Sequence, residues 1–162
     1  MTDRLDIADV RREMIKVYLR WRGFRFLIDQ DGDLIVRFRC RGVIVDYLLV
    51  AEPNGKIISF KTYTDMSFEI EKIPLVLIVI NQFQRANRWP RLTVATRDDA
   101  AFIVAEGHLL MEDSVDQGEV NRFLDCGLMA TNQCWEEFEL PDVGSAEAQI
   151  VEFLRDHREG AA

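Results

Sequence analysis

The chain has 162 residues, of which 48% are hydrophobic and 30% are charged, and its formal net charge at pH 7 is −8. This length and composition predict a single globular domain over residues 1–162, with a core of ordinary size. The acidic balance argues against general nucleic-acid binding, which requires basic surface to neutralise phosphates.

The charge is distributed unevenly along the chain. Residues 1–41 contain ten Lys or Arg and seven Asp or Glu, a net of +3, so the remaining residues carry −11. Two interpretations stay open. Either both ends of the chain present solvated helix faces, or the basic and acidic ends pair with each other, within one chain or between two copies.

The start of the chain, MTDRLDIADVRRE, is charged and lacks the apolar segment of a secretory signal. The longest apolar run, residues 75–80, is far shorter than the roughly 20 residues of a membrane-spanning helix. Cys40, Cys126 and Cys134 make an odd number without CxxC spacing, which is typical of a reduced protein. We therefore expect a cytoplasmic protein with no membrane partner.

Residues 3–22 have the periodicity of an amphipathic helix. Thr2 or Asp3 can cap its start, and Gly23 can end it in a left-handed conformation. Apolar residues at a 3.6-residue period predict the buried side of this helix, with charged residues opposite; they are Ile7, Val10, Met14, Val17, Tyr18 and Trp21.

Four strands joined by short turns are predicted next, over residues 24–29, 34–41, 43–51 and 56–64. Each connection contains a glycine, and the Asp-Gly pair after the first strand is typical of a tight hairpin. Short turns between consecutive strands give an antiparallel meander. The third strand is apolar on both faces over most of its length, as expected of a central strand.

The apolar run at residues 75–80 fits a buried strand or a buried helix, because four of its six residues are β-branched. We favour a helix because Pro74 suits the first helical turn and is excluded from a central strand. The segment also continues to Asn87 without a turn signal. A helix that is apolar nearly all round is expected to be covered on both sides, by the sheet and by another helix or a second subunit.

The rest of the chain predicts a second hairpin and two helices. The hairpin covers residues 92–95 and 101–110, and a capping box of Asp116 and Glu119 starts a long helix that ends near Phe138. Residues 139–162 form a C-terminal extension with a short acidic helix at 146–157. The predicted class is α+β, an antiparallel sheet with helices packed on it, in the order α-β-β-β-β-α-β-β-α-α.

The sequence supplies no recognisable catalytic or cofactor-binding constellation. His108 and His157 are the only histidines and have no nucleophile signature beside them. Cys126 and Cys134 are eight residues apart on one helix, so they point in different directions and cannot share one metal ion. Nucleotide-binding loops and the complete spacing of an EF-hand are also missing. We predict a protein that is not an enzyme and uses no cofactor or metal.

Three arginines alternate along the second predicted strand and its end, at Arg37, Arg39 and Arg41, and are predicted to share one face. Such a face could receive an acidic peptide or an anion. The alternative is internal pairing, either across the strands with Asp46 or with the acidic C-terminal helices, and we favour this alternative.

The second half of the chain contains a motif that resembles a known family. NQFQRANRWPR at residues 81–91 is similar to the N-x-W-N … W-P-(R/K) stretch of YbjN-type proteins, described as "putative bacterial sensory-transduction regulators". Phe83 and Gln84 depart from the Trp and Asn that are common there. The resemblance extends over residues 5–138. It implies a fold like that of type III secretion chaperones, with helices on one face of a twisted sheet, often a dimer, and no catalytic residues.

We therefore expect a non-enzymatic cytoplasmic module that is regulatory or binds a protein, as a homodimer. The alternative is a chaperone-like binder of an extended segment of a client protein. An enzyme of unrecognised type is a third possibility. The candidate partner-binding residues lie on the central helix, at its join to the second hairpin, and on the arginine face; they are Leu75, Val76, Val79, Phe83, Trp89, Arg37, Arg39 and Arg41.

Overall fold

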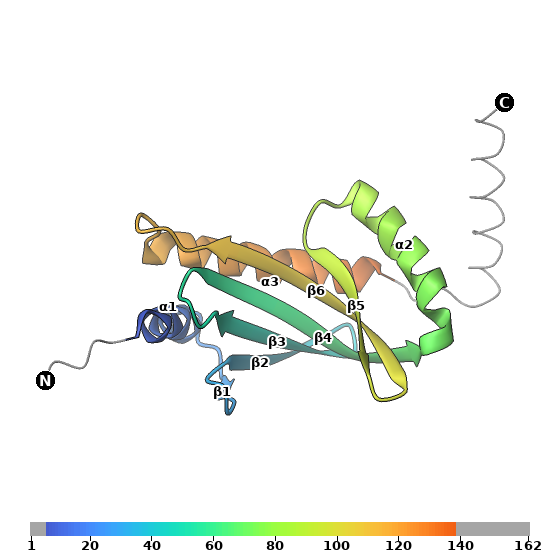
Figure 1. Cartoon of the computed structure of the whole chain (residues 1–162), viewed down its shortest axis with the longest axis horizontal. Coiled ribbons are helices and arrows are strands. Elements are labelled where there is room, and N and C mark those ends of the chain that lie inside the picture. The colour runs from blue at the N-terminus through green and yellow to red at the C-terminus, as the bar shows by residue number, and fades with distance from the viewer. Residues whose placement is uncertain (1–5, 139–162) are drawn as a thin grey trace, which may run out of the picture.

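The computed structural model describes residues 6–138 and shows an α+β fold with one antiparallel sheet (Figure 1). The predicted fold class is confirmed, and the elements follow the predicted order. The final predicted helix, at 146–157, lies outside the described residues. The elements are α1 (Ile7–Trp21), β1 (Leu27–Ile28), β2 (Leu34–Cys40), β3 (Val43–Ala51), β4 (Ile57–Glu69), the 3-10 helix η1 (Ile70–Lys72), α2 (Ile73–Ala86), β5 (Arg91–Arg97), β6 (Ala100–Leu110) and α3 (Gln117–Glu137).

The sheet has the strand order β1-β2-β3-β4-β6-β5, with every neighbouring pair antiparallel. The first four strands form the predicted meander. The turn between β2 and β3 places Arg41 and Gly42 at φ values of 46° and 90°, so a tight two-residue turn fixes this register. After β4 the chain passes through α2 to the sheet edge, and β6 then returns to lie beside β4.

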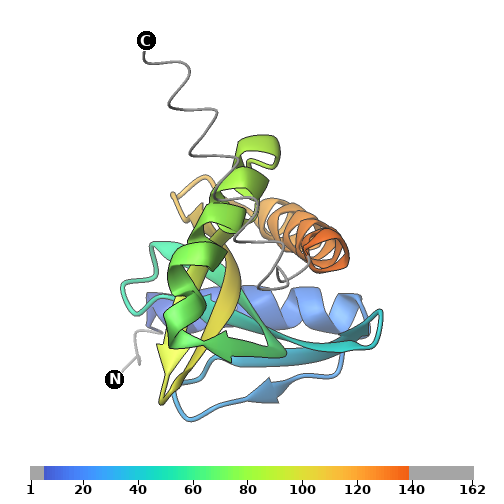
Figure 2. The same ribbon diagram turned by 90° about the vertical axis from the view of Figure 1, so that its right-hand side faces the viewer.

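All described helices pack on the same face of the sheet. Alternate residues of β3 are buried from Val45 to Ala51, and the residues between them are only partly buried. This alternation is expected when one face is covered and the other is open. Figure 2 shows the first two strands below all three helices.

The core divides into two clusters, and α3 contributes to both. The first cluster joins α1 and the N-terminal half of α3 to β2, β3 and β4, around Tyr47, Phe60 and Leu124. The second cluster joins α2 and the C-terminal half of α3 to β5 and β6, around Ile80 and Trp135. The long amphipathic α3 therefore ties the two ends of the sheet together.

Of the predicted buried side of α1, Tyr18 is fully buried and Met14 is half-buried against the first cluster, whereas the prediction is wrong for the other four residues. The side chains that contact the sheet belong to a neighbouring stripe, centred on Ile15 and Leu19, which are at most 1% exposed. The apolar arc of α1 is wider than the surface that covers it, and periodicity cannot say which part the sheet takes. The predicted residues that remain exposed, by 41–63%, are Ile7, Val10, Val17 and Trp21.

The ends of two predicted elements also differ. The Asp6 side chain caps α1 by accepting a hydrogen bond from the backbone N–H of Ala8 at 3.3 Å, and the predicted caps at residues 2 and 3 lie outside the described residues. The strand predicted at 24–29 is reduced to Leu27–Ile28. Phe24 packs edge-on against Phe38 instead, with ring centroids 5.3 Å apart. Burial of this aromatic ring takes precedence over strand pairing at that position.

Candidate protein-binding surfaces

The central helix α2 buries one side against the second core cluster. Pro74 occupies the first turn, as predicted, and Val76 and Ile80 are 2% and 5% exposed. Val79 and Phe83 are half-buried and pack against the same cluster. Val76 therefore belongs to the core, while Val79 and Phe83 present only one edge to solvent.

The other side of α2 carries an apolar patch that no described residue covers. Leu77 is 46% exposed, Pro74 is exposed, and Ile78 is half-buried on the same side. Ile70 in η1, 37% exposed, precedes them. We call Ile70, Pro74, Leu77 and Ile78 the α2 patch. Leu75 is half-buried at the margin of this side, so of the predicted residues it lies nearest to the patch.

The two flanking arginines of the predicted basic face are paired. Arg37 makes a bidentate ion pair with Asp46, directly across the strands, with N···O distances of 2.6 and 2.8 Å. This hydrogen-bonded carboxylate raises the pKa of Arg37. Arg41 lies in the turn after β2 and reaches Glu136 of α3 at 3.5 Å. The predicted alternative of internal pairing is thus observed for both residues.

The three arginines therefore do not share one face. Arg37 and Arg39 point to the open face of the sheet, whereas Arg41 turns toward the helices because its left-handed conformation reverses the chain. Arg39 is exposed and makes no ion pair with residues 6–138. Of the predicted basic face, only Arg39 is left as a free cation in this part of the chain.

Trp89 anchors the join between α2 and β5. Its ring packs edge-on against Phe60, with centroids 5.3 Å apart, and lies 6.1 Å from Phe123 of α3. Its outer edge borders an open hollow of about 610 Å³ on the solvent side of α3, where Met129 is 72% exposed. The half-buried ring thus connects the first core cluster to the surface.

Gln84 holds this join in place, a role that no sequence pattern predicted. Its side-chain amide donates hydrogen bonds to the carbonyls of Asn87 and Pro90, at 3.2 and 2.9 Å. Its carbonyl oxygen accepts a bond from the backbone N–H of Leu92 at 3.3 Å. One side chain thus satisfies three backbone groups of the tight connection and positions Trp89.

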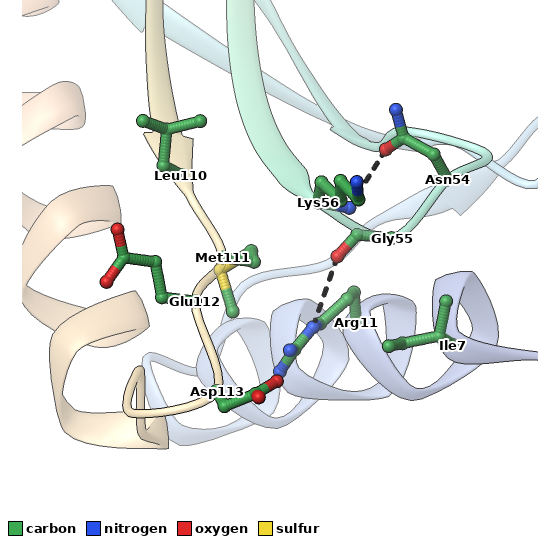
Figure 3. Close-up of a pocket in the computed structure, with 9 residues that line it drawn as sticks. All are labelled: Ile7, Arg11, Asn54, Gly55, Lys56, Leu110, Met111, Glu112 and Asp113. Atoms are coloured by element: carbon green, nitrogen blue, oxygen red, sulfur yellow. Dashed lines mark hydrogen bonds between the residues drawn. The ribbon is translucent and has the colours of Figure 1, made fainter.

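A second hollow, of about 280 Å³, opens where the start of α1 meets the turn after β3 and the end of β6 (Figure 3). Arg11 donates a hydrogen bond to the carbonyl of Gly55 at 3.4 Å across it. Lys56, Glu112 and Asp113 place charges of both signs around its rim. Mixed charge and a short apolar floor give this hollow no clear ligand preference.

The thiols give no sign of chemistry at these surfaces. Cys126 is exposed, whereas Cys134 is buried, and burial raises the pKa of the Cys134 thiol to about 12. Cys134 therefore stays protonated at neutral pH. Within residues 6–138 no three His, Cys, Asp or Glu side chains are grouped to hold a metal ion. No helix in the same part of the chain is long and apolar enough to cross a membrane.

These features define a class: an α+β domain whose sheet carries helices on one face and whose surface exposes apolar helix residues. Comparison with known families then identifies the particular family. Residues 11–140 match the YbjN family, described as "putative bacterial sensory transduction regulator", and the chain belongs to that family. The motif at 81–91 that resembled this family forms the join between α2 and β5.

A solved structure supports the fold. It is titled "Crystal structure of YbjN, a putative transcription regulator from E. coli". The similarity has a TM-score of 0.59 at 13% sequence identity and covers 75% of this chain and 85% of the other. At this identity the likeness shows the shared fold alone. A search of curated proteins finds no match to the chain.

Proposed function

We propose that this protein is a non-enzymatic regulatory module that works by binding another protein, as a homodimer. In this proposal the chain is one domain, with residues 139–162 as an extension, and acts in the cytoplasm without a cofactor. Membership of a family described as regulators supports the regulatory role. The uncovered α2 patch supports binding of a protein rather than of a small molecule.

The α2 patch carries the proposal because its apolar surface has no role in the core. Val76 and Ile80 already fill the contact between α2 and the second cluster, so Leu77 contributes little to folding while it stays exposed. Exposed apolar side chains that cluster on one element typically mark an interaction site. Lys72 before the patch pairs with Glu69 at 3.3 Å, whereas Arg85 beyond it is exposed and has no ion pair with residues 6–138. This free cation favours a partner with acidic residues around an apolar contact.

The test is a comparison of two variants on the same helix. Leu77→Asp places a charge in the patch, and Gln82→Asp places the same charge at an exposed polar position. Protein partners are captured by chemical cross-linking in a lysate of the source organism and identified by mass spectrometry. We expect a partner that is lost with Leu77→Asp and kept with Gln82→Asp. Equal capture by both variants would reject the α2 patch as the binding surface.

A chaperone-like role is the second candidate, and one observation favours it. β1 pairs only with Leu34 and Ile35 of β2, so residues 36–40 have no described strand on their outer edge. An extended client segment can add to such an edge through backbone hydrogen bonds. Arg39 on this strand would favour an acidic client. The test is hydrogen exchange at residues 36–40 with an acidic β-forming peptide added. Slower exchange in the wild type, together with no change on adding the peptide to Arg39→Glu, would support this role.

A further inference from the structure

Helix α1 carries a regular apolar stripe, of which only Met14 packs against the first core cluster. Its members follow one another at intervals of three, four, three and four residues, which is the a/d spacing of a coiled coil over two heptads. Four of them are 41–63% exposed and Met14 is half-buried. We call this set the α1 stripe; it consists of Ile7, Val10, Met14, Val17 and Trp21.

The packing of α1 holds the stripe outward. Ile15 and Leu19 anchor the neighbouring side of the helix in the first cluster. On the flank, Tyr18 donates a hydrogen bond to Asp125 of α3 at 2.9 Å, and Arg22 pairs with the same carboxylate at 3.1 Å. These contacts fix the rotation of α1 about its axis, so the stripe cannot turn into the core.

We propose that the α1 stripe is the surface through which two copies of this chain associate, with their α1 helices antiparallel. This inference rests on the homodimer proposed above. It adds that the dimer interface lies on α1 rather than on α2. The α2 patch then stays free for the protein partner. Each copy uses the same residues, as a two-fold axis requires.

The stripe is self-complementary in size. In an antiparallel pair, a positions of one helix face d positions of the other. Centring the axis between Met14 and Val17 places Val10 opposite Trp21 of the partner subunit, so that the smallest and largest members share a layer. Met14 then faces the partner's Val17. Small side chains opposite large ones allow two identical stripes to interlock without a void.

The charges beside the stripe are self-complementary as well. Glu13 and Arg20 both occupy g positions, which face each other in an antiparallel pair. Their side chains are 57% and 63% exposed and lie 3.9 Å apart within one chain, where Glu13 also pairs with Lys16 at 2.6 Å. Across the two-fold axis each would meet the opposite charge of the partner, twice. Binding of a different protein would not require the charges of this helix to complement one another. Their complementarity therefore favours a second copy of this chain as the partner at the α1 stripe.

The α2 patch lacks these properties. Its apolar residues run from Ile70 to Ile78 and then give way to Asn81 and Arg85 on the same side. If two copies faced each other through α2, their Arg85 side chains would approach one another in several arrangements. Helix α2 has no acidic residue to offset this repulsion. The α1 stripe extends over two heptads and has charges of both signs beside it, and we expect reversible association.

The test measures the mass of the full-length chain by analytical ultracentrifugation. Total concentrations run from about 1 to about 100 µM, so that reversible association changes the mean mass with concentration. Val17→Asp places a charge in the stripe, and Leu77→Asp is the matched control in the α2 patch. We expect a dimer for the wild type and for Leu77→Asp, and an increase in Kd of at least about 100-fold for Val17→Asp. Circular dichroism confirms that each variant is folded.

Charge exchange separates a second copy from other occupants. Glu13→Arg and Arg20→Glu should each weaken the dimer about 5- to 10-fold, and the double variant should restore it.

A dimer lost in Leu77→Asp but kept in Val17→Asp would overturn the inference and leave the homodimer in place. A monomeric wild type would reject both the inference and the homodimer, whereas partner capture through the α2 patch would be judged separately. The inference would also be overturned if Val17→Asp abolished binding of a different protein without changing self-association of the chain.

Discussion

The two core clusters bury their side chains in different ways, although one helix and one sheet serve both. The first cluster encloses large aromatic residues, and Tyr18, Tyr47 and Phe60 are at most 2% exposed. The second holds Trp135 and Phe138 beside smaller aliphatic residues, and Ile80, Leu92 and Trp135 keep 5–6% of their surface accessible. Stability is therefore concentrated where α1 and α3 cross the meander. The end that holds α2 leaves Leu77 on the outer side of that helix 46% exposed.

Phe60 is the centre of the first cluster and should show the largest effect. Its ring stacks on Tyr47 at 5.3 Å and contacts Trp89 and Phe123. Phe60→Ala removes a fully buried ring that neighbours cannot replace, and should lower the free energy of unfolding by about 3–5 kcal/mol. Urea denaturation measures the change. Phe60→Leu, which keeps most of the volume, should cost far less, and similar losses for both would contradict the packing account.

The second cluster should show a smaller loss, confined to one side of α2. Ile80→Ala should lower the free energy of unfolding by about 2–4 kcal/mol because Ile80 packs against β5 and α3. Leu77→Ala, on the exposed side of the same helix, should change it by less than about 1 kcal/mol. Thermal and urea unfolding of the two variants supply the comparison. Equal losses would show that the α2 patch is covered in solution.

Two glycines make room for the Phe60 ring, and filling one should also destabilise the first cluster. A Cβ at Gly127 of α3 would lie 2.5 Å from Phe60 Cε1 and 2.6 Å from Tyr47 Oη. Alanine favours a helix by about 1 kcal/mol over glycine, yet Gly127→Ala should cost about 1–3 kcal/mol through overpacking. The double variant with Phe60→Leu should cost less than the sum of the single changes. Additive losses would show that the two positions do not touch.

The smallest effect is a pH dependence that arises in the first cluster. Burial raises the pKa values of Tyr47 and Tyr18, and Asp125 raises that of Tyr18 further. Below pH 10 both states keep these protons. Above it the unfolded chain loses them first, so stability falls as pH rises, by about 1.4 kcal/mol per pH unit for each proton.

Tyr47→Phe should reduce the loss of unfolding free energy per pH unit above pH 10 by the contribution of one proton. Phe38→Leu, a change in the same cluster that does not titrate, should lower the stability by a constant amount and leave the slope unchanged. Urea melts between pH 9 and pH 11 measure both slopes. An unchanged slope in Tyr47→Phe would mean that the hydroxyl is open to solvent in the folded state.

Local patterns predicted much of the fold because their physical causes are local. The Asp116–Glu119 capping box forms with both reciprocal hydrogen bonds, at 2.9 and 3.3 Å. Pro74 starts α2, and glycines at positive φ turn the meander. Each of these signals needs only a few neighbouring residues. The family motif at residues 81–91 is also a local pattern, and its resemblance to the YbjN family indicated the fold.

Side-chain partners across the fold were decided by tertiary structure. Periodicity marked α1 as amphipathic, but the sheet and α3 selected the stripe around Ile15 and left Val17 and Trp21 outside. The sequence placed Gly107 and Gly127 in a strand and a helix without a reason for either. Only the approach of β6 and α3 to the Phe60 ring explains them. A sequence pattern states which residues can be buried, and packing in three dimensions determines which of them are.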